Sequence, residues 1–464
     1  MNSTFYTRPV ARPAEDLPRE AAMRAPLVRR LWHVMVAELY TFLFLEIYRS
    51  YISFAWGYLG FAYRPMETWE LAFVSVSVAI VAFAMPLRIE RPSSLVLWLM
   101  FVFVFVPTQC LTPIIGERGA EFYIESLLAL TAVMLVACIV SQRKLPETMV
   151  GSSGLPGPAF DLWLTIAFLV ATLILFVMYR SIISFASIDD IYTQRFAAAD
   201  IAAAGGIGYV RTYYTTVVCS TLIALGLMVP GRKALAVLGA AGFVFTYMID
   251  AQKMSLLTPV IVIALWVMLR RRWNTAVLFT GGLAALTAFT ALLVNQTAVV
   301  RYFADLVLLR SIAVPGQTFA FYYDLFSAGG YTWWSNITGL GRVIPAPPAF
   351  ANNPAWPVLG QIVGDAYFGP LIRLNANANL FAGEGVAAAG ALGVLVIGLA
   401  WVVWLRLFDI CSLGWNRTFV LLVTAPLGLL LTNTHLSTLL ISFGGLFWLL
   451  ILHYYKPPAR RDAI

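Results

Sequence analysis

The sequence predicts an all-α polytopic membrane protein with about twelve transmembrane helices. The 464-residue chain is 60% hydrophobic and only 12% charged, and its mean hydropathy is +0.81. Soluble domains average about 45–50% apolar and about 25% charged residues. Apolar stretches of about 20 residues recur along the chain, which is the length a helix needs to cross a bilayer core. Basic residues gather in alternate loops. These observations exclude a soluble enzyme, a secreted disulfide scaffold and a disordered chain.

The expected spans follow one another along most of the chain. The stretch 31–63 is long enough to contain a bend, and the stretch 233–249 is short for a span. Counts of eleven or thirteen spans therefore remain open alternatives. The twelve expected spans lie near 31–55, 69–87, 94–115, 122–141, 159–179, 212–230, 233–249, 254–270, 275–295, 387–407, 417–433 and 437–455.

Charge placement predicts the topology. Residues 1–30 have no early apolar core, so we interpret them as a cytoplasmic tail rather than a cleavable signal peptide. With this tail inside, the inner segments hold twenty basic and eight acidic residues, a balance of +12. The remaining eleven basic and fifteen acidic residues give −4. This distribution satisfies the positive-inside rule at every inner loop, so the net charge of +8 indicates topology rather than nucleic-acid binding.

The domain organisation follows from this topology. Two segments on the outer side are long enough to carry function, and the second is the largest hydrophilic feature of the chain. The predicted divisions are a cytoplasmic tail at 1–30, spans one to nine within 31–295 with an outer loop at about 180–211, a large, partly helical periplasmic loop at 296–386, spans ten to twelve within 387–455 and a second cytoplasmic tail at 456–464.

The cysteines and histidines offer little chemistry. The four cysteines are scattered and no two form a CxxC pair, so we expect no structural disulfide, metal site or cofactor. We expect His33 and His453 near the inner membrane interface. His435, between two spans, is the one histidine expected on the outer side.

Basic residues on the outer side go against the topological bias. The planar fork of arginine suits bidentate binding of phosphate or pyrophosphate, so these residues predict an outward-facing clamp for a lipid-linked pyrophosphate. Solvated loop charge and headgroup anchoring remain the alternative. The candidate pyrophosphate-binding residues are Arg195, Arg211, Lys253, Arg301, Arg310, Arg342 and Arg373.

The segment 296–386 is expected to be structured. Val299–Ser311 has helical composition, and we expect this helix to stop before Pro315. Arg301 and Asp305 would share a face of it and could pair. Aromatic and amide side chains follow, and these could bind sugars, although interface anchoring and ordinary turns are alternatives. The candidate sugar-binding residues are Tyr322, Tyr323, Asn377 and Asn379.

Few groups could serve as a general base on the outer side. A carboxylate at the edge of the bilayer has its pKa raised by desolvation or lowered beside an arginine, and either state suits work on a sugar hydroxyl. Glu384, between two glycines, is the leading catalytic candidate, followed by Asp365 and then His435.

Several of these segments occur in a characteristic order. Along the chain come Asp190–Arg195, Lys253–Ser255, Arg310–Gly316, Tyr322–Phe326 and Asn375–Gly385. With a large outer loop late in the chain, this order resembles the Wzy-type oligosaccharide repeat-unit polymerases, which make O-antigen and exopolysaccharide. The resemblance covers about residues 180–400. One departure is that many family members have Asp-Gly where this chain has Glu-Gly.

The resemblance implies a metal-independent, GT-C-like membrane glycosyltransferase of the bacterial inner membrane. Such an enzyme transfers the growing glycan from undecaprenyl pyrophosphate to the non-reducing end of another lipid-linked repeat unit, at the periplasmic face. The implied partners are the lipid-linked donor and acceptor and the bilayer; a chain-length regulator and a flippase are also compatible, and nucleic acid is not. On this hypothesis the first five basic residues hold the donor pyrophosphate. Arg342 and Arg373 hold the acceptor or close the crevice, and Glu384 orients or deprotonates the attacking hydroxyl.

Three other functions remain open. An O-antigen ligase would share the spans and the large outer loop but use a different acceptor. A transferase using a polyprenyl monophosphate sugar usually has an acidic motif in its first outer loop, where this chain has only Glu67. A flippase or transporter would place charges and broken helices at mid-membrane, and here Glu38, Glu46 and Arg49 are the only such charges.

Overall fold

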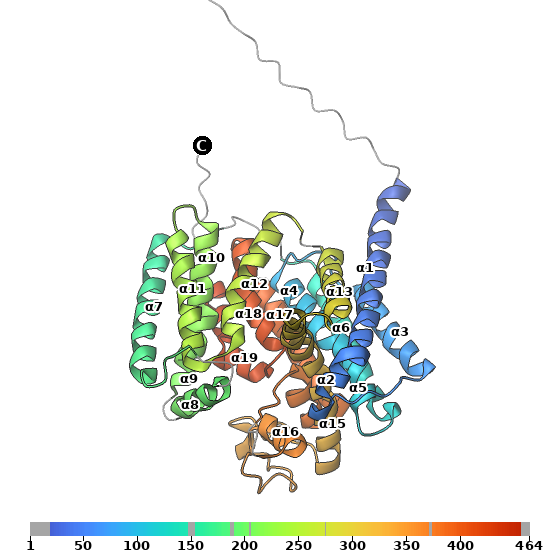
Figure 1. The fold of residues 1–464 in the computed structure, drawn as a ribbon. Coiled ribbons are helices and arrows are strands. Elements are labelled where there is room, and N and C mark those ends of the chain that lie inside the picture. The colour runs from blue at the N-terminus through green and yellow to red at the C-terminus, as the bar shows by residue number, and fades with distance from the viewer. Residues whose placement is uncertain are drawn as a thin grey trace, which may run out of the picture.

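The fold is a bundle of helices (Figure 1). The structure, a computed structural model, describes residues 19–146, 154–185, 190–203, 206–273, 275–370 and 374–455, and no β-strand occurs among them. The helices are α1 Arg19–Ile47, α2 Ser53–Trp56, α3 Thr68–Ala84, α4 Pro92–Met100, α5 Val106–Ile115, α6 Ile124–Gln142, α7 Pro158–Tyr179, α8 Ile191–Ala203, α9 Ile207–Tyr213, α10 Ser220–Met228, α11 Lys233–Asp250, α12 Lys253–Arg270, α13 Ala276–Leu293, α14 Ala298–Phe303, α15 Val314–Gly329, α16 Leu359–Phe368, α17 Ala387–Cys411, α18 Arg417–Leu431, α19 Leu436–Ser442 and α20 Gly445–Tyr454.

Each of the twelve expected spans coincides with helical structure. Within the described residues, nine helices are long and apolar enough to cross a membrane, and a tenth is the pair α19 and α20, which is bent by 53°. The apolar helices α3 and α18 are shorter. The prediction of a multi-pass helical membrane protein is therefore supported at the level of about nine or ten spanning helices.

One continuous helix runs through the centre of the bundle, and we call it the central helix. It consists of α4, a π-helical turn at Phe101–Phe105 and α5. The most apolar stretch of this helix is 94% buried inside the protein, against 22% for α7. A helix that is apolar on all sides can be buried among other helices, and α15 and α18 pack against this one. Figure 1 shows α7 at the margin of the bundle.

The two ends of the bundle differ. Figure 1 shows α1 beginning at the same end as the turn between α10 and α11, which we call the basic end because the turn carries Arg232 and Lys233. It shows α8, α9 and α16 at the opposite end, which we call the outer end. Helix α16, which belongs to the long segment 296–386, therefore lies at the opposite end of the bundle from the start of α1.

The expected helix end before Pro315 is wrong. The chain is helical from Ala298 to Gly329, through α14, π-helical turns at Ala304–Ala313 and α15. Pro315 is the second residue of α15, directly after the π-helical turns, and the helix continues through it. Gly316 packs so closely on α5 that a Cβ there would lie 2.5 Å from the Pro107 carbonyl oxygen. Much of this segment is therefore packed into the bundle rather than free-standing.

His33, which is expected near the inner membrane interface, packs into the protein interior. Its side chain is fully buried, and Nδ1 lies 2.8 Å from the Ala82 carbonyl oxygen. The ring stands edge-on to Trp98 at a centroid distance of 4.7 Å. His33 faces inward because α1 packs along both α3 and α13, whereas His453, near the end of α20, is exposed.

Candidate functional site

Two arginines predicted to bind pyrophosphate meet at the end of α11. The Arg211 Nη1 atom, from α9, lies 3.3 Å from Oδ2 of Asp250, and the two side chains are only 16% and 5% exposed. Arg195, from α8, donates from Nη2 to the Ala251 carbonyl oxygen at 3.0 Å. Ala251 has φ of +50° and caps α11. Both guanidinium groups thus lie at a helix C-terminus, where the carbonyl dipoles favour cations.

The position of α8 is fixed by Gln194. Its Nε2 contacts the carbonyl oxygens of Ile182 at 3.2 Å, Ser184 at 3.1 Å and Met248 at 2.5 Å. These carbonyls belong to the segment after α7 and to the last turn of α11. A buried amide with such partners holds the short α8 against two longer helices, which sets where Arg195 projects.

Lys253 links this region to the segment 296–386. It begins α12, and its Nζ lies 4.8 Å from the centre of the Tyr302 ring on α14, a cation–π contact. Arg301, next to Tyr302, is exposed. We call Arg195, Arg211, Asp250 and Lys253 the arginine cluster.

The predicted pair of Arg301 with Asp305 is not formed. The Asp305 carboxylate accepts hydrogen bonds from the Tyr51 hydroxyl at 2.9 Å and from the Trp56 indole at 2.8 Å. Asp305 therefore bonds to these two aromatic donors rather than to Arg301. The bonds connect the π-helical turns at Ala304–Ala313 to the end of the first span.

The other predicted basic residues are more dispersed. Arg310 is exposed in the π-helical turns, and Arg342 is exposed in a 3₁₀ turn at Leu340–Arg342. Arg373 lies outside the described residues. Asp250 and Gln194 were not predicted as site residues. An acidic residue ending an apolar helix three residues before a lysine is the signal that could have found Asp250.

Two of the three catalytic candidates lie in a second group. Glu384 is 1% exposed and accepts hydrogen bonds from the first turn of α19. The donors are the Leu436 backbone N–H at 2.8 Å, the Ser437 backbone N–H at 3.2 Å and the Ser437 hydroxyl. The carboxylate thus accepts hydrogen bonds from N–H groups that have no partner within the helix. Its negative charge also interacts favourably with the positive N-terminal end of the α19 dipole.

His435 precedes this turn and is half-buried beside Glu384. A Cβ on Gly383 would lie 2.0 Å from its Nε2, so only glycine admits the ring here. Within the described part of the chain, Nε2 has no hydrogen-bond partner. Burial lowers the pKa of His435, and the Glu384 charge opposes that shift. We call Glu384, His435 and Ser437 the carboxylate–histidine cluster.

Asp365, the other catalytic candidate, does not join this cluster. It lies on α16 and is half-buried, and Figure 1 shows α16 at the outer end of the molecule. In the part of the chain that the structure describes, no ion pair or hydrogen bond connects Asp365 with Glu384 or His435.

The candidate sugar-binding residues are mostly internal. Asn379 is fully buried; its Nδ2 donates to the Thr108 hydroxyl and the Pro315 carbonyl, both at 3.0 Å. Tyr322 is also fully buried. Tyr323 is 8% exposed and packs edge-on to Tyr123. These three side chains hold the interior together and leave little surface for a sugar.

Asn377 is the remaining candidate. It is half-buried, and its Oδ1 atom has no hydrogen-bond partner within the described residues. A Cβ on Gly360 would lie 2.1 Å from that oxygen, so the amide sits against α16. Among the four amide and tyrosine candidates, Asn377 has the most exposed side chain, although this oxygen is itself enclosed by protein.

No break was predicted in α17. Ala389 and Gly390 have non-helical backbone angles inside this apolar helix. The carbonyls of Ala387 and Ala388 instead accept the backbone N–H groups of Thr332 at 2.8 Å and Trp333 at 3.0 Å. Irregular backbone at membrane depth occurs where it is buried in protein or lines a cavity.

The segment 332–334, which pairs with the break in α17, has a strained backbone and contacts the carboxylate–histidine cluster. Trp333 and Trp334 both have positive φ, +48° and +61°. The Trp334 indole donates to the Glu384 carbonyl oxygen at 2.9 Å. Backbone strain of this kind persists where surrounding contacts fix it and is frequent at functional sites.

The side chains gathered in the two clusters are guanidinium, ammonium, carboxylate and imidazole groups, which bind anions and exchange protons. Among the described residues, no group of three or more histidine, cysteine, aspartate or glutamate side chains is placed to hold a metal ion. No protein-family model, curated protein or solved structure matches the chain.

Proposed function

We propose that the chain is a membrane glycosyltransferase of the Wzy polymerase type. It would transfer a growing glycan from undecaprenyl pyrophosphate to another lipid-linked repeat unit, at the periplasmic face of a bacterial inner membrane, with both termini cytoplasmic. The observation that carries the proposal is the convergence of Arg195 and Arg211, from two helices, on the end of α11, next to Lys253 at the start of α12.

The chemistry of the arginine cluster suits a pyrophosphate leaving group. Negative charge develops on the departing pyrophosphate in the transition state, and cations that are already in place stabilise it without reorganisation. Three cations and Asp250 leave this cluster with a formal charge of +2. Asp250 holds Arg211 in a fixed position, so the guanidinium is ordered before substrate arrives.

The carboxylate–histidine cluster supplies a group for the acceptor hydroxyl. The lowered pKa of His435 keeps its ring neutral near pH 7, and a neutral imidazole can accept a proton. Glu384 accepts hydrogen bonds from the first turn of α19, so we assign it the role of orienting the loop that carries His435. Asn377 would contact the sugar. The donor and acceptor lipids are the required partners, and a chain-length regulator or flippase would act beside the enzyme.

Reconstitution tests the proposal. Purified protein in liposomes receives a lipid-linked repeat unit as sole substrate, and products are separated by size. Lys253→Gln should lower polymer formation about a hundredfold, the scale of losing one transition-state donor. Arg211→Lys keeps the charge beside Asp250 and should also lose activity, because the planar fork is gone. Arg118→Gln, which removes an outer arginine stacked on Phe122, should polymerise normally.

A transporter is a second candidate because α17 is broken. Transporters bind substrates at discontinuous helices, and Ala389 and Gly390 interrupt one here. The same liposomes separate the two functions: translocation of labelled lipid-linked unit without polymer would contradict the polymerase. A product joined to lipid A core, rather than to another repeat unit, would indicate the ligase.

A further inference from the structure

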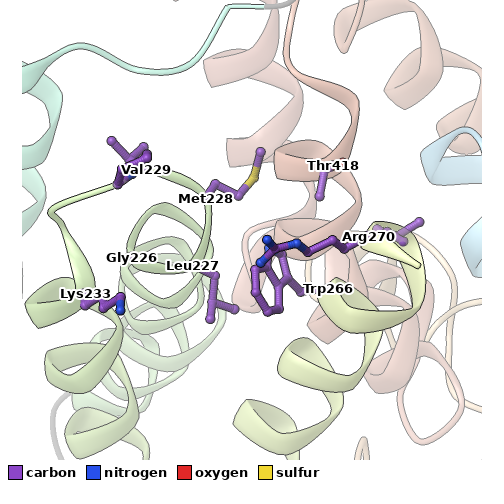
Figure 2. A pocket seen from close by; sticks show the side chains of 10 residues that line it. Gly226, Leu227, Met228, Val229, Lys233, Trp266, Arg270 and Thr418 are labelled. Carbon is purple, nitrogen blue, oxygen red and sulfur yellow. The ribbon is translucent and has the colours of Figure 1, made fainter. Parts of the chain in front are cut away.

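A cavity of about 480 Å³ lies at the basic end of the bundle, away from both clusters. It is lined by the end of α10, the start of α11, the end of α12 and the start of α18 (Figure 2). The proposed function makes no use of this space.

The helix arrangement explains the cavity. Gly226 lets α10 and α11 approach closely, since a Cβ there would lie 2.3 Å from the Ala236 backbone nitrogen. The turn through Pro230 and Gly231, with φ of +85° at the glycine, then carries the chain directly into α11. The end of α12 and the start of α18 close the other side.

The cavity wall combines two cations with apolar surface. Lys233 and Arg270 are the charged residues of the lining, which holds no acidic residue. Neither forms an ion pair with another described residue, and the nearby acid Asp161 is paired with Arg232. Figure 2 shows the Arg270 side chain reaching over the Trp266 ring, with the guanidinium 5.2 Å from the ring centre. The Thr418 side chain adds a hydroxyl to the lining.

Exposed apolar side chains lie next to the two cations on the same helices. Val237 follows Lys233 by four residues and is 69% exposed, and Val267 precedes Arg270 by three and is 37% exposed. Residues at these spacings share a helix face. A ligand whose anionic group meets the cations therefore has apolar surface below it for a hydrocarbon chain.

We propose that this cavity binds the phosphate headgroup of an anionic phospholipid. Lys233 and Arg270 would hold the phosphate, and the acyl chains would lie along Val237 and Val267. Basic pockets between helix ends at a membrane surface suit such headgroups, and the apolar faces favour a lipid over a soluble phosphate ester. The site is independent of the proposed function.

Native mass spectrometry of the full-length protein in detergent tests this site, with phosphatidylglycerol as the probe and phosphatidylcholine as its zwitterionic counterpart. The wild type should retain phosphatidylglycerol preferentially. Lys233→Gln and Arg270→Gln should each weaken retention about fivefold, and more when combined. A matched double variant, Arg88→Gln with Lys144→Gln, removes two exposed basic residues from other loops and should bind as the wild type does.

Three outcomes would overturn the proposal. They are equal retention of the two lipids, unchanged retention in the double cavity variant, and an equal loss in the matched control. A competition arm distinguishes the phosphate sources. Inorganic phosphate at millimolar concentration should leave the lipid bound, and its displacement of the lipid would replace the lipid assignment with a soluble anion site. A thermal unfolding curve for each variant ensures that folded protein is compared.

Discussion

At the residue scale, several polar side chains that suggest binding instead hold helices together. Asn379 joins α5 to α15, and Glu384 fixes the start of α19. Both lie in apolar surroundings, where an unsatisfied polar group is costly, so their hydrogen bonds are a condition of folding. Arg195 and Arg211 were predicted for their chemistry and do lie together, through Ala251 and Asp250.

Glu384→Gln tests the structural and functional roles of this carboxylate together. The amide loses one acceptor and turns an N–H₂ group toward donors, so the free energy of unfolding should fall by about 1–3 kcal/mol, measured by denaturant titration in detergent micelles. Full-length protein should still be made, but no polymer. The exposed Glu121→Gln is the control. Wild-type polymer length in Glu384→Gln would contradict the assignment.

Arg310→Ala separates function from stability. Arg310 is exposed, so its loss should change the free energy of unfolding by no more than about 0.5 kcal/mol. Polymer should nevertheless be absent if Arg310 contacts the donor pyrophosphate. Expression level and polymer length, compared in a strain that lacks the wild-type protein, check both statements. Normal polymer would remove Arg310 from the site.

Asp324 should give the protein a pH-dependent stability. Burial raises the pKa of its carboxyl above 3.8, although Tyr123 and the Glu117 backbone N–H donate to it. Below about pH 4 both the folded and unfolded forms are protonated, and the contribution is fully present. As pH rises through the folded pKa it is lost, because ionisation favours the unfolded chain. Asp324→Asn should flatten this part of the stability profile; an unchanged slope would contradict the argument.

At the element scale, breaks and bulges place the polar groups. The break in α17 leaves the carbonyls of Ala387 and Ala388 for the inserted segment at Thr332 and Trp333. π-helical turns likewise interrupt the first span, the central helix, the α9–α10 helix and the segment 298–329. Hydropathy averages over such features, because one turn of altered backbone does not change composition.

Gly390→Ala tests the break in α17. Gly390 has φ of +57°, and an added Cβ would lie 2.8 Å from the Tyr331 hydroxyl oxygen. The substitution should cost about 1–3 kcal/mol of unfolding free energy, measured by denaturant titration. Gly57→Ala is the control, since Gly57 has φ of −54° and no atom within 4 Å of an added Cβ. Equal effects in the two variants would contradict the strained geometry.

At the scale of the whole molecule, the two ends of the bundle should face opposite sides of the membrane. A cysteine replacing exposed Val343 should react with a membrane-impermeant maleimide in intact cells, whereas one replacing exposed Arg88 should react only after permeabilisation. Three native cysteines are buried and Cys411 is partly exposed, so a Cys411→Ser background removes the accessible thiol. Reversed labelling would invert the predicted topology.

The sequence by itself predicted a multi-pass helical protein and the approximate position of each long apolar helix, because burial in a bilayer demands long apolar stretches whose length and composition can be read directly. It also identified Arg195, Arg211 and Lys253 as residues of interest. Only the tertiary structure decided that Asp250 joins them, that Tyr322 and Asn379 face inward and that α17 is broken. These depend on packing between segments far apart in the chain, which local composition does not encode.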